Sequence, residues 1–172
     1  DAVVGNEVSL EIQGRSPLRV TLPRGVKDGA RIRLAGQGQP APAGGEGKPG
    51  DLYLQIVVRP HPVFRREGND LHVDVPVTVP ELILGAAIKV PTPDGRVDVR
   101  IPPRSANGQT LRLREKGIAV GKSDAKRGHL FLHLVAVLPS DADPAVEEIA
   151  KKLEPFYGDA DPRAALRWEA GQ

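Results

Sequence analysis

The sequence has no cysteine and no methionine, and its only aromatic residues are one Trp, two Tyr and three Phe among 172 residues. Without cysteine, the chain can form no disulfide, no cysteine-ligated zinc site and no thiol nucleophile. With so few aromatics, any hydrophobic core must be built mainly from Val, Leu and Ile. The lack of methionine and the aspartate at position 1 lead us to expect a fragment or a processed product.

Long apolar runs are also missing. None approaches the ~20 residues that cross a bilayer, and no secretory signal is present. Lys and Arg number 24 against 22 Asp and Glu, which gives a formal net charge of +2. The basic residues are scattered among acidic ones, whereas a nucleic-acid-binding domain concentrates them on one face. We therefore predict a cytoplasmic protein that binds neither membrane nor nucleic acid.

What the sequence does contain is an internal repeat with a spacing of about 80 residues. Three segments return in the same order: 20–23, 31–38 and 50–57 recur as 99–102, 110–117 and 128–135. Solenoid repeats have periods of ~20–50 residues, so this longer spacing predicts two tandem copies of one small domain. The second copy opens with residues 70–77, which have no equivalent ahead of Gly5. We therefore expect the chain to start partway into its first domain.

Apolar and polar residues alternate through both copies, for example at Val8, Leu10 and Ile12 and again from Leu71 to Val77. Period-two patterns separated by Gly, Pro or Asn-Gly predict strands joined by turns, with a tight hairpin at Asp94-Gly95. A short helix is expected over 80–84, closed by Gly85. The predicted fold class is all-β, with two tandem small β-sandwich-like domains at 1–66 and 67–139.

The last segment, 140–172, has a different pattern. Asp143 is a good helix N-cap and Pro144 suits the first helical position. Apolar residues then recur at helical spacing on one side of the predicted helix and just beyond it, at Val146, Ile149, Leu153, Phe156 and Tyr157. This pattern predicts either an association surface or a helix that folds back onto its own domain.

No set of residues predicts an enzyme, a metal site or a cofactor site. Gly45–Gly50 matches a dinucleotide-binding string, but that motif must follow a strand and open a helix, and here it lies in a predicted loop. His129 and His133 lie on a predicted strand, where four residues span ~13 Å, too far to chelate one ion. We expect these histidines to face solvent or an interface.

Phe64 is an unusual aromatic, because charged residues follow it in what should be the connector between the two domains. An aromatic side chain in this place is either a plug between the domains or the floor of a groove.

Three stretches, 22–34, 50–54 and 61–71, resemble the C-terminal substrate-binding region of the DnaJ family, and so do 84–85 and 90–95. Members of this family are J-domain co-chaperones of DnaK-type chaperones. The resemblance covers residues 5–139. It implies two tandem β-sandwich-like domains and a C-terminal dimerisation element. Together these make a homodimer whose arms hold non-native polypeptide.

The resemblance also implies site residues. Leu10 and Ile12 match the two inward residues of a strand beside a shallow apolar depression. Phe64 matches the aromatic that closes this depression, and Leu18 is a further candidate. The predicted dimer interface consists of Ile149, Leu153, Phe156 and Tyr157.

Two departures from the family pattern narrow the expectation. Only residues 13–17 stand where one class of the family carries a cysteine-rich zinc module, so the chain resembles the zinc-free class. The His-Pro-Asp signature of the J-domain is absent, and His61-Pro62-Val63 is not that signature. The predicted function is binding of unfolded client polypeptides, in stress as in ordinary protein folding, for delivery to a DnaK-type chaperone. The rival hypothesis is a scaffold β-module in which every apolar strand residue is core.

Overall fold

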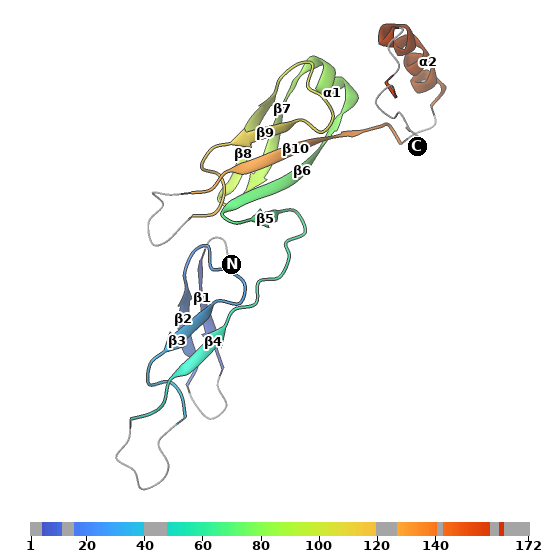
Figure 1. The fold of residues 1–172 in the computed structure, drawn as a ribbon. Helices are drawn as coiled ribbons and strands as arrows, with labels where there is room; N and C mark the ends of the chain where they lie inside the picture. The colour runs from blue at the N-terminus through green and yellow to red at the C-terminus, as the bar shows by residue number, and fades with distance from the viewer. Residues whose placement is uncertain are drawn as a thin grey trace, which may run out of the picture. The chain divides into compact units, whose positions relative to one another are not determined.

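The computed structural model of the chain describes residues 5–11, 16–39, 48–119, 127–140, 143–158 and 162–163. Residues 1–137 form one compact unit and residues 138–172 form another. Within the first unit we call residues 5–57 the first lobe, 58–64 the connector and 65–137 the second lobe (Figure 1). The predicted boundaries at 66/67 and 139/140 stay a prediction.

The described residues of the second lobe form six strands and one short helix. They are β5 (Arg65–Glu67), β6 (Asp70–Thr78), α1 (Val79–Leu84), β7 (Ala86–Thr92), β8 (Gly95–Ile101), β9 (Thr110–Leu113) and β10 (Leu130–Val137). Four strands form one sheet in the order β5-β6-β10-β9, and β7 and β8 pair with each other. β6 and β10 pair in parallel, and every other pair is antiparallel. The all-β prediction is confirmed.

The core of the second lobe lies between the four-stranded sheet and the β7–β8 pair. Alternate residues of β6 and β10 are buried, as the period-two pattern predicts. Residues of β7, β8 and α1 complete the core. The buried cluster is Leu71, Val73, Val75, Val77, Leu82, Val90, Val99, Ile101, Ile118, Leu130, Leu132 and Leu134. The second lobe is therefore a two-layer sandwich with an aliphatic core.

Helix α1 begins with a capping box. The Glu81 backbone N–H donates to Thr78 Oγ1, and the Thr78 backbone N–H donates to a Glu81 carboxylate oxygen at 2.8 Å. The second of these hydrogen bonds holds the pKa of Glu81 below its usual value. Gly85 closes the helix with φ +80°, where an added Cβ would lie 2.9 Å from the Ile101 carbonyl oxygen. The predicted helix and its closing glycine are confirmed.

The first lobe repeats part of the second. Its strands are β1 (Asn6–Leu10), β2 (Leu18–Leu22), β3 (Arg31–Leu34) and β4 (Leu52–Gln55). β1 pairs with β2 as β7 does with β8, and β3 pairs with β4 as β9 does with β10. Within the described residues, no strand of the first lobe corresponds to β6. Most apolar residues of β1–β4 are accordingly half-buried rather than buried.

The hairpin between β7 and β8 differs slightly from the prediction. Thr92 and Gly95 are the last paired residues, so Pro93 and Asp94 are the two turn residues rather than Asp94 and Gly95. The Thr92 hydroxyl donates to the Gly95 carbonyl oxygen at 2.9 Å and closes the turn. Proline presets φ for the first central position of a turn, which explains the displacement by one residue.

The second unit contains α2 (Pro144–Leu153) and a 3-10 turn, η1 (Glu154–Tyr157). The Asp143 carboxylate accepts a hydrogen bond from the Ala145 backbone N–H at 2.8 Å, as expected for a helix N-cap. No residue of either element is buried within this chain. None of the helices among the described residues has the length and apolar character to cross a membrane.

The core assignment can be tested by truncating one buried side chain of β10. We expect Leu132→Ala to lower the free energy of unfolding by about 2–5 kcal/mol, because the cavity it leaves is enclosed on all sides. Val135→Ala on the same strand is the matched control, since Val135 is 43% exposed. Its expected effect is below about 1 kcal/mol. Urea denaturation followed by circular dichroism measures both, and equal midpoints would contradict the assignment.

Candidate functional site

Two of the predicted site residues face each other across one strand pair. Leu10 and Leu18 are register partners at the end of the β1–β2 pair, and Val8 and Val20 are partners two residues earlier. Side chains opposite each other on one face of an antiparallel pair lie in contact distance. Leu10 and Leu18 are both half-buried, whereas Val20 is buried. Ile12, the other predicted strand residue, lies outside the described residues.

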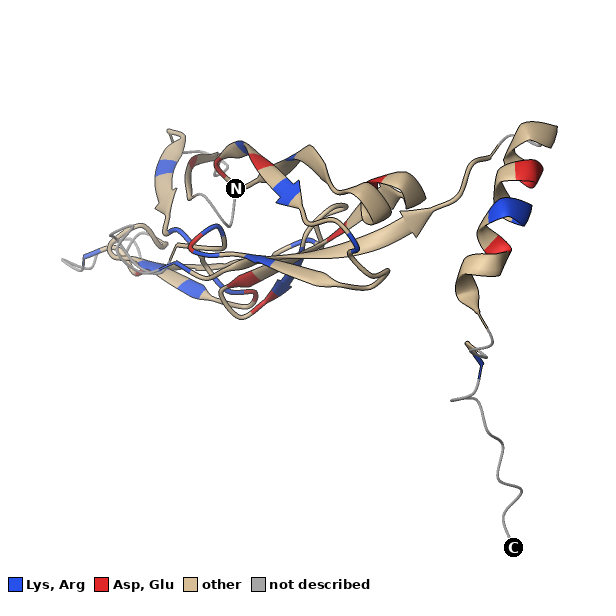
Figure 2. Cartoon of the chain, turned by 90° about the horizontal axis from the view of Figure 1, so that it is seen from above, with Lys and Arg blue, Asp and Glu red and all other residues tan. Residues whose placement is uncertain are grey.

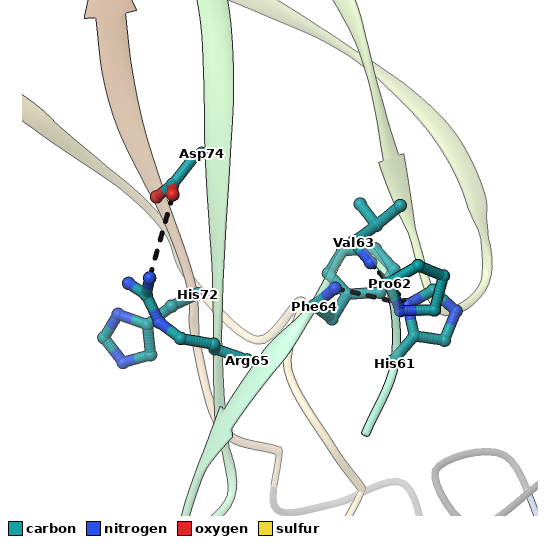
Figure 3. A pocket seen from close by; sticks show the side chains of 7 residues that line it. All are labelled: His61, Pro62, Val63, Phe64, Arg65, His72 and Asp74. Atoms are coloured by element: carbon teal, nitrogen blue, oxygen red, sulfur yellow. Dashed lines mark hydrogen bonds and ion pairs between the residues drawn. The ribbon is translucent and has the colours of Figure 1, made fainter. Parts of the chain in front are cut away.

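Phe64 lies at the end of the connector, immediately before β5. His61 shapes this segment, because its Nδ1 accepts the backbone N–H groups of Val63 at 3.1 Å and Phe64 at 3.2 Å. The two rings lie 5.2 Å apart between centroids (Figure 3). Phe64 packs against the core of the second lobe and remains half-buried. It therefore combines features of both alternatives, with one side on the core and another beside open space.

Two hollows open beside Phe64. The smaller has a volume of about 340 Å³ and is lined by the connector, the start of β5 and the outer side chains His72 and Asp74 of β6 (Figure 3). Arg65 Nη1 lies 3.7 Å from Asp74 Oδ2 at its edge. The larger hollow, about 880 Å³, lies between the turn at Lys27-Asp28, the connector and the β7–β8 turn.

The structure thus brings the predicted residues together only in part. Leu10 and Leu18 lie together on the β1–β2 pair, and Phe64 lines both hollows. Neither Leu10 nor Leu18 is among the described residues that line these hollows. The assignment of these residues to one client site stays a prediction.

A hydrogen-bonded chain that the sequence pattern does not reveal crosses the outer face of the four-stranded sheet. His72 Nε2 lies 3.2 Å from a Glu67 carboxylate oxygen, and His72 Nδ1 lies 3.0 Å from His133 Nε2. His133 Nδ1 in turn lies 2.9 Å from the Thr110 hydroxyl. These residues come from β5, β6, β10 and β9, so the chain joins all four strands. Hydrogen bonds on both ring nitrogens therefore hold His133 in place on the sheet, and its ring is not free in solvent.

Arg66 joins the two lobes, and this role was not identified from the sequence either. Its guanidinium donates from Nη1 to the Val26 carbonyl oxygen and from Nη2 to that of Gly25, each at 2.8 Å. Its Nε donates to the Gly68 carbonyl oxygen at 2.9 Å. The alternation in β5 contains the signal, because Arg66 occupies the inward position between two exposed neighbours. An arginine at an inward strand position needs acceptors, and here the other lobe supplies two of them.

Gly25 allows the lobes to approach at this point. Its φ is +72°, and a Cβ added there would lie 2.6 Å from the Ala119 carbonyl oxygen and 3.0 Å from Ile118 Cγ2. A glycine is required both by the backbone conformation and by the packing. The neighbouring Val26 is buried. The turn after β2 is therefore fixed against the second lobe.

The described residues contain no arrangement that points to catalysis. Among them, no three His, Cys, Asp or Glu side chains gather as a metal site would require. Strongly perturbed carboxyl groups often mark active sites. Besides Glu81 in its capping box, the carboxyl group with a lowered pKa is that of Asp51, which accepts the Gly36 backbone N–H and pairs with Arg33 at 2.6 Å. Both carboxylates have structural partners and lie outside the two hollows.

Comparison with known proteins gives one family. A family profile described as the DnaJ C terminal domain matches residues 1–139. A protein named Chaperone protein DnaJ 2 from Cutibacterium acnes is 41% identical over 153 residues, covering 88% of this chain and 38% of the relative. One named Chaperone protein DnaJ from a Janthinobacterium species is 38% identical over 143 residues, covering 83% of this chain and 37% of the relative.

A further relative has a different name. The Curved DNA-binding protein of Pseudomonas putida is 46% identical over 136 residues, which cover 79% of this chain and 41% of the relative. The chain spans about two fifths of the length of the curated relatives that it matches. The similarity therefore covers only one part of each of those proteins.

The role of Arg66 in joining the lobes gives a test. We expect Arg66→Ala to lower the free energy of unfolding of the first unit by about 2–4 kcal/mol, since hydrogen bonds to a charged group are lost and two carbonyl groups lose their partner. Arg65→Ala is the matched control, because Arg65 is exposed and its ion pair is long, so that its loss costs at most about 1 kcal/mol. Urea denaturation measures stability, and limited proteolysis of the connector reports loosening. Equal behaviour of the two variants would show that Arg66 does not join the lobes.

Proposed function

The chain belongs to the DnaJ C-terminal domain family, and we propose that it binds non-native polypeptide as the client-binding part of a co-chaperone. The observation that carries the proposal is the half-exposed apolar pair Leu10 and Leu18 on a two-stranded sheet. A two-stranded sheet leaves each strand with an unpaired edge among the described residues. An extended client segment can add to such an edge through backbone hydrogen bonds while its side chains enter apolar pockets.

Phe64 supplies the aromatic part of the proposed site. A client has no fixed sequence, so the site must accept many apolar side chains of different shape. A half-buried ring beside an open hollow can do so, because the ring is held by the core and still offers apolar surface. In this proposal Leu10 and Leu18 contact the client along the β1–β2 pair, Phe64 contacts it from the connector, and Ile12 is a further contact residue.

The expected affinity of one such site is low. Burying one apolar side chain of the client stabilises the complex by ~1.5–3 kcal/mol before the cost of ordering the chain. A second copy of the site on a linked partner raises the effective concentration of binding sites for a long client. A homodimer therefore suits this function, and the apolar surface of the second unit is the proposed interface. Phe156 is 87% exposed, Tyr157 70% and Ile149 59% within the single chain.

We further propose delivery of the bound client to a DnaK-type chaperone in the cytoplasm, without a cofactor and without enzymatic activity of the chain itself. Delivery and location are what membership of the DnaJ family implies. The division into domains at 1–66, 67–139 and 140–172 belongs to the same proposal. The rival is a scaffold module without a client site, in which Leu10 and Phe64 serve packing alone.

Mutation of Leu10 on the strand together with Phe64 on the connector distinguishes the client-binding proposal from the scaffold module. We expect Leu10→Ser with Phe64→Ser to weaken suppression of aggregation of a heat-unfolded reporter enzyme by about tenfold or more, because two apolar contacts are lost. The control is Tyr53→Ser with Val57→Ser, which removes two exposed apolar residues elsewhere in the first lobe. Light scattering measures aggregation, and circular dichroism measures folding. Unfolding of the first double variant, or unchanged suppression, would favour the scaffold.

The proposed dimer is tested separately. We expect Leu153→Glu to halve the mass measured by multi-angle light scattering, because a buried carboxylate without a partner strongly opposes association. Lys151→Glu is the control, since helical spacing places Lys151 away from the apolar side of α2. A dimeric mass for the Leu153 variant, or a monomeric mass for the unmodified chain at the same concentration, would contradict this interface.

A further inference from the structure

Most of the charged residues at the larger hollow are basic. The side chains of Lys27, Arg59, Arg65 and Arg66 line it together with a single carboxylate, that of Asp28. Lys27 and Arg59 are exposed, and their side chains form no ion pair or hydrogen bond with any described residue. Asp28 is already engaged, because its Oδ1 accepts the Val58 backbone N–H at 2.8 Å. The hollow therefore presents free cations and few free acceptors.

His61 adds one more donor. Its Nδ1 accepts two backbone N–H groups, so in the neutral ring the proton lies on Nε2, which donates. His61 also lines the larger hollow. A ligand that satisfies this lining must supply acceptors and negative charge.

The remaining lining is mostly apolar, apart from Gly68 and from Thr92, whose hydroxyl already donates to the Gly95 carbonyl oxygen. Val58 and Pro60 of the connector, Phe64, Leu71 and Pro93 of the β7–β8 turn contribute the apolar part. The ligand therefore needs an apolar group next to its negative charge. The Arg66 hydrogen bonds to the first lobe hold the two sides of the hollow in place, so its shape is largely set before a ligand arrives.

We propose that this hollow binds client segments in which an Asp or Glu residue neighbours a large apolar residue. The carboxylate contacts Lys27 and Arg59, and the apolar side chain contacts Phe64. This inference rests on the proposed function and specifies its substrate class. Lys27 and Arg59 then determine which client segments bind most tightly, and Phe64 contributes an apolar contact that any client can make.

A nucleic-acid backbone also carries negative charge, and some relatives are named Curved DNA-binding protein. The apolar lining favours a peptide, because a phosphate backbone offers no large apolar group to Phe64 and Pro93. The distribution of charge favours it too. Figure 2 shows that Lys and Arg alternate with Asp and Glu along the ribbon of the described residues, whereas a duplex-binding protein concentrates its basic residues.

The experiment compares two fluorescein-labelled peptides of equal length. Both contain Leu-Phe, flanked in one by two Asp residues and in the other by two Asn residues. Binding to the complete 172-residue chain is measured by fluorescence anisotropy at low and at high salt. We expect the Asp peptide to bind about tenfold more tightly at low salt, and the difference to shrink as salt screens the charges.

Charge reversal at Lys27 and Arg59 tests the residues. We expect Lys27→Glu with Arg59→Glu to abolish the preference for the Asp peptide or to reverse it, while the Asn peptide keeps its affinity within about twofold. The control is Arg31→Glu with Arg100→Glu, which changes the net charge equally at exposed positions outside both hollows. This control should keep the preference for the Asp peptide. Lys27→Gln with Arg59→Gln gives the same test should the reversed variant unfold.

The outcomes separate the inference from the function on which it rests. If neither peptide binds and aggregation of a reporter is not suppressed, the proposed function fails and this inference with it. If both peptides bind equally, or if the control variant abolishes the preference as well, the inference fails and client binding stands. If a labelled DNA duplex binds and loses affinity in the Lys27 and Arg59 variant while the peptides do not, the hollow is a phosphate site and the inference is overturned.

Discussion

The parallel pairing of β6 with β10 is the interaction on which the rest of the second lobe depends. Two parallel strands cannot be joined by a tight turn, so the chain between them must leave the sheet and return. Here that crossover contains α1, the β7–β8 pair and β9, and the pair packs over the sheet to enclose the core. The same pairing places His72 beside His133 on the outer face, where β6 also contributes His72 and Asp74 to the smaller hollow. One strand pair thus determines both the buried and the open face of the sheet.

The first lobe shows what the same pattern does without a strand like β6 among the described residues. β1–β4 repeat the pairings of β7–β10, and their apolar residues alternate in the same way. In the second lobe, β6 and β10 are packed from the other layer and their alternate residues are buried. In the first lobe, Leu10 and Leu18 have each other as partners and remain half-exposed. A period-two pattern therefore predicts a strand, but it does not by itself decide whether its apolar residues become core or surface.

The difference between predicting a strand and predicting its burial explains how much of the fold and of the site could be predicted from the sequence. The alternating residues of β6 and β10, the helix closed by Gly85 and the N-cap at Asp143 were predicted correctly, because each depends on neighbours within a few residues. The hydrogen bond between His72 and His133 joins residues 61 positions apart, and the hydrogen bonds of Arg66 to the first lobe join residues 40 and 41 positions apart. The alternation in β5 indicates that Arg66 points inward, but no local pattern identifies these distant partners. For Phe64, the sequence offered a plug or a groove as alternatives, and the structure gives its ring both kinds of neighbour.

Phe64 packs against the core and also lines a hollow, and this has a consequence for the specificity of the proposed site. A ring that packs against the core cannot move freely to fit each ligand, so it contributes contact area rather than discrimination. The cations beside it differ in this respect, because exposed charges act over several ångströms and tolerate variation in the shape of a ligand. A site of this composition can hold many sequences weakly and still prefer those that carry a suitable charge. In the proposed site, apolar contact determines whether a segment binds at all, and the charged rim determines which of the bound segments stay longest.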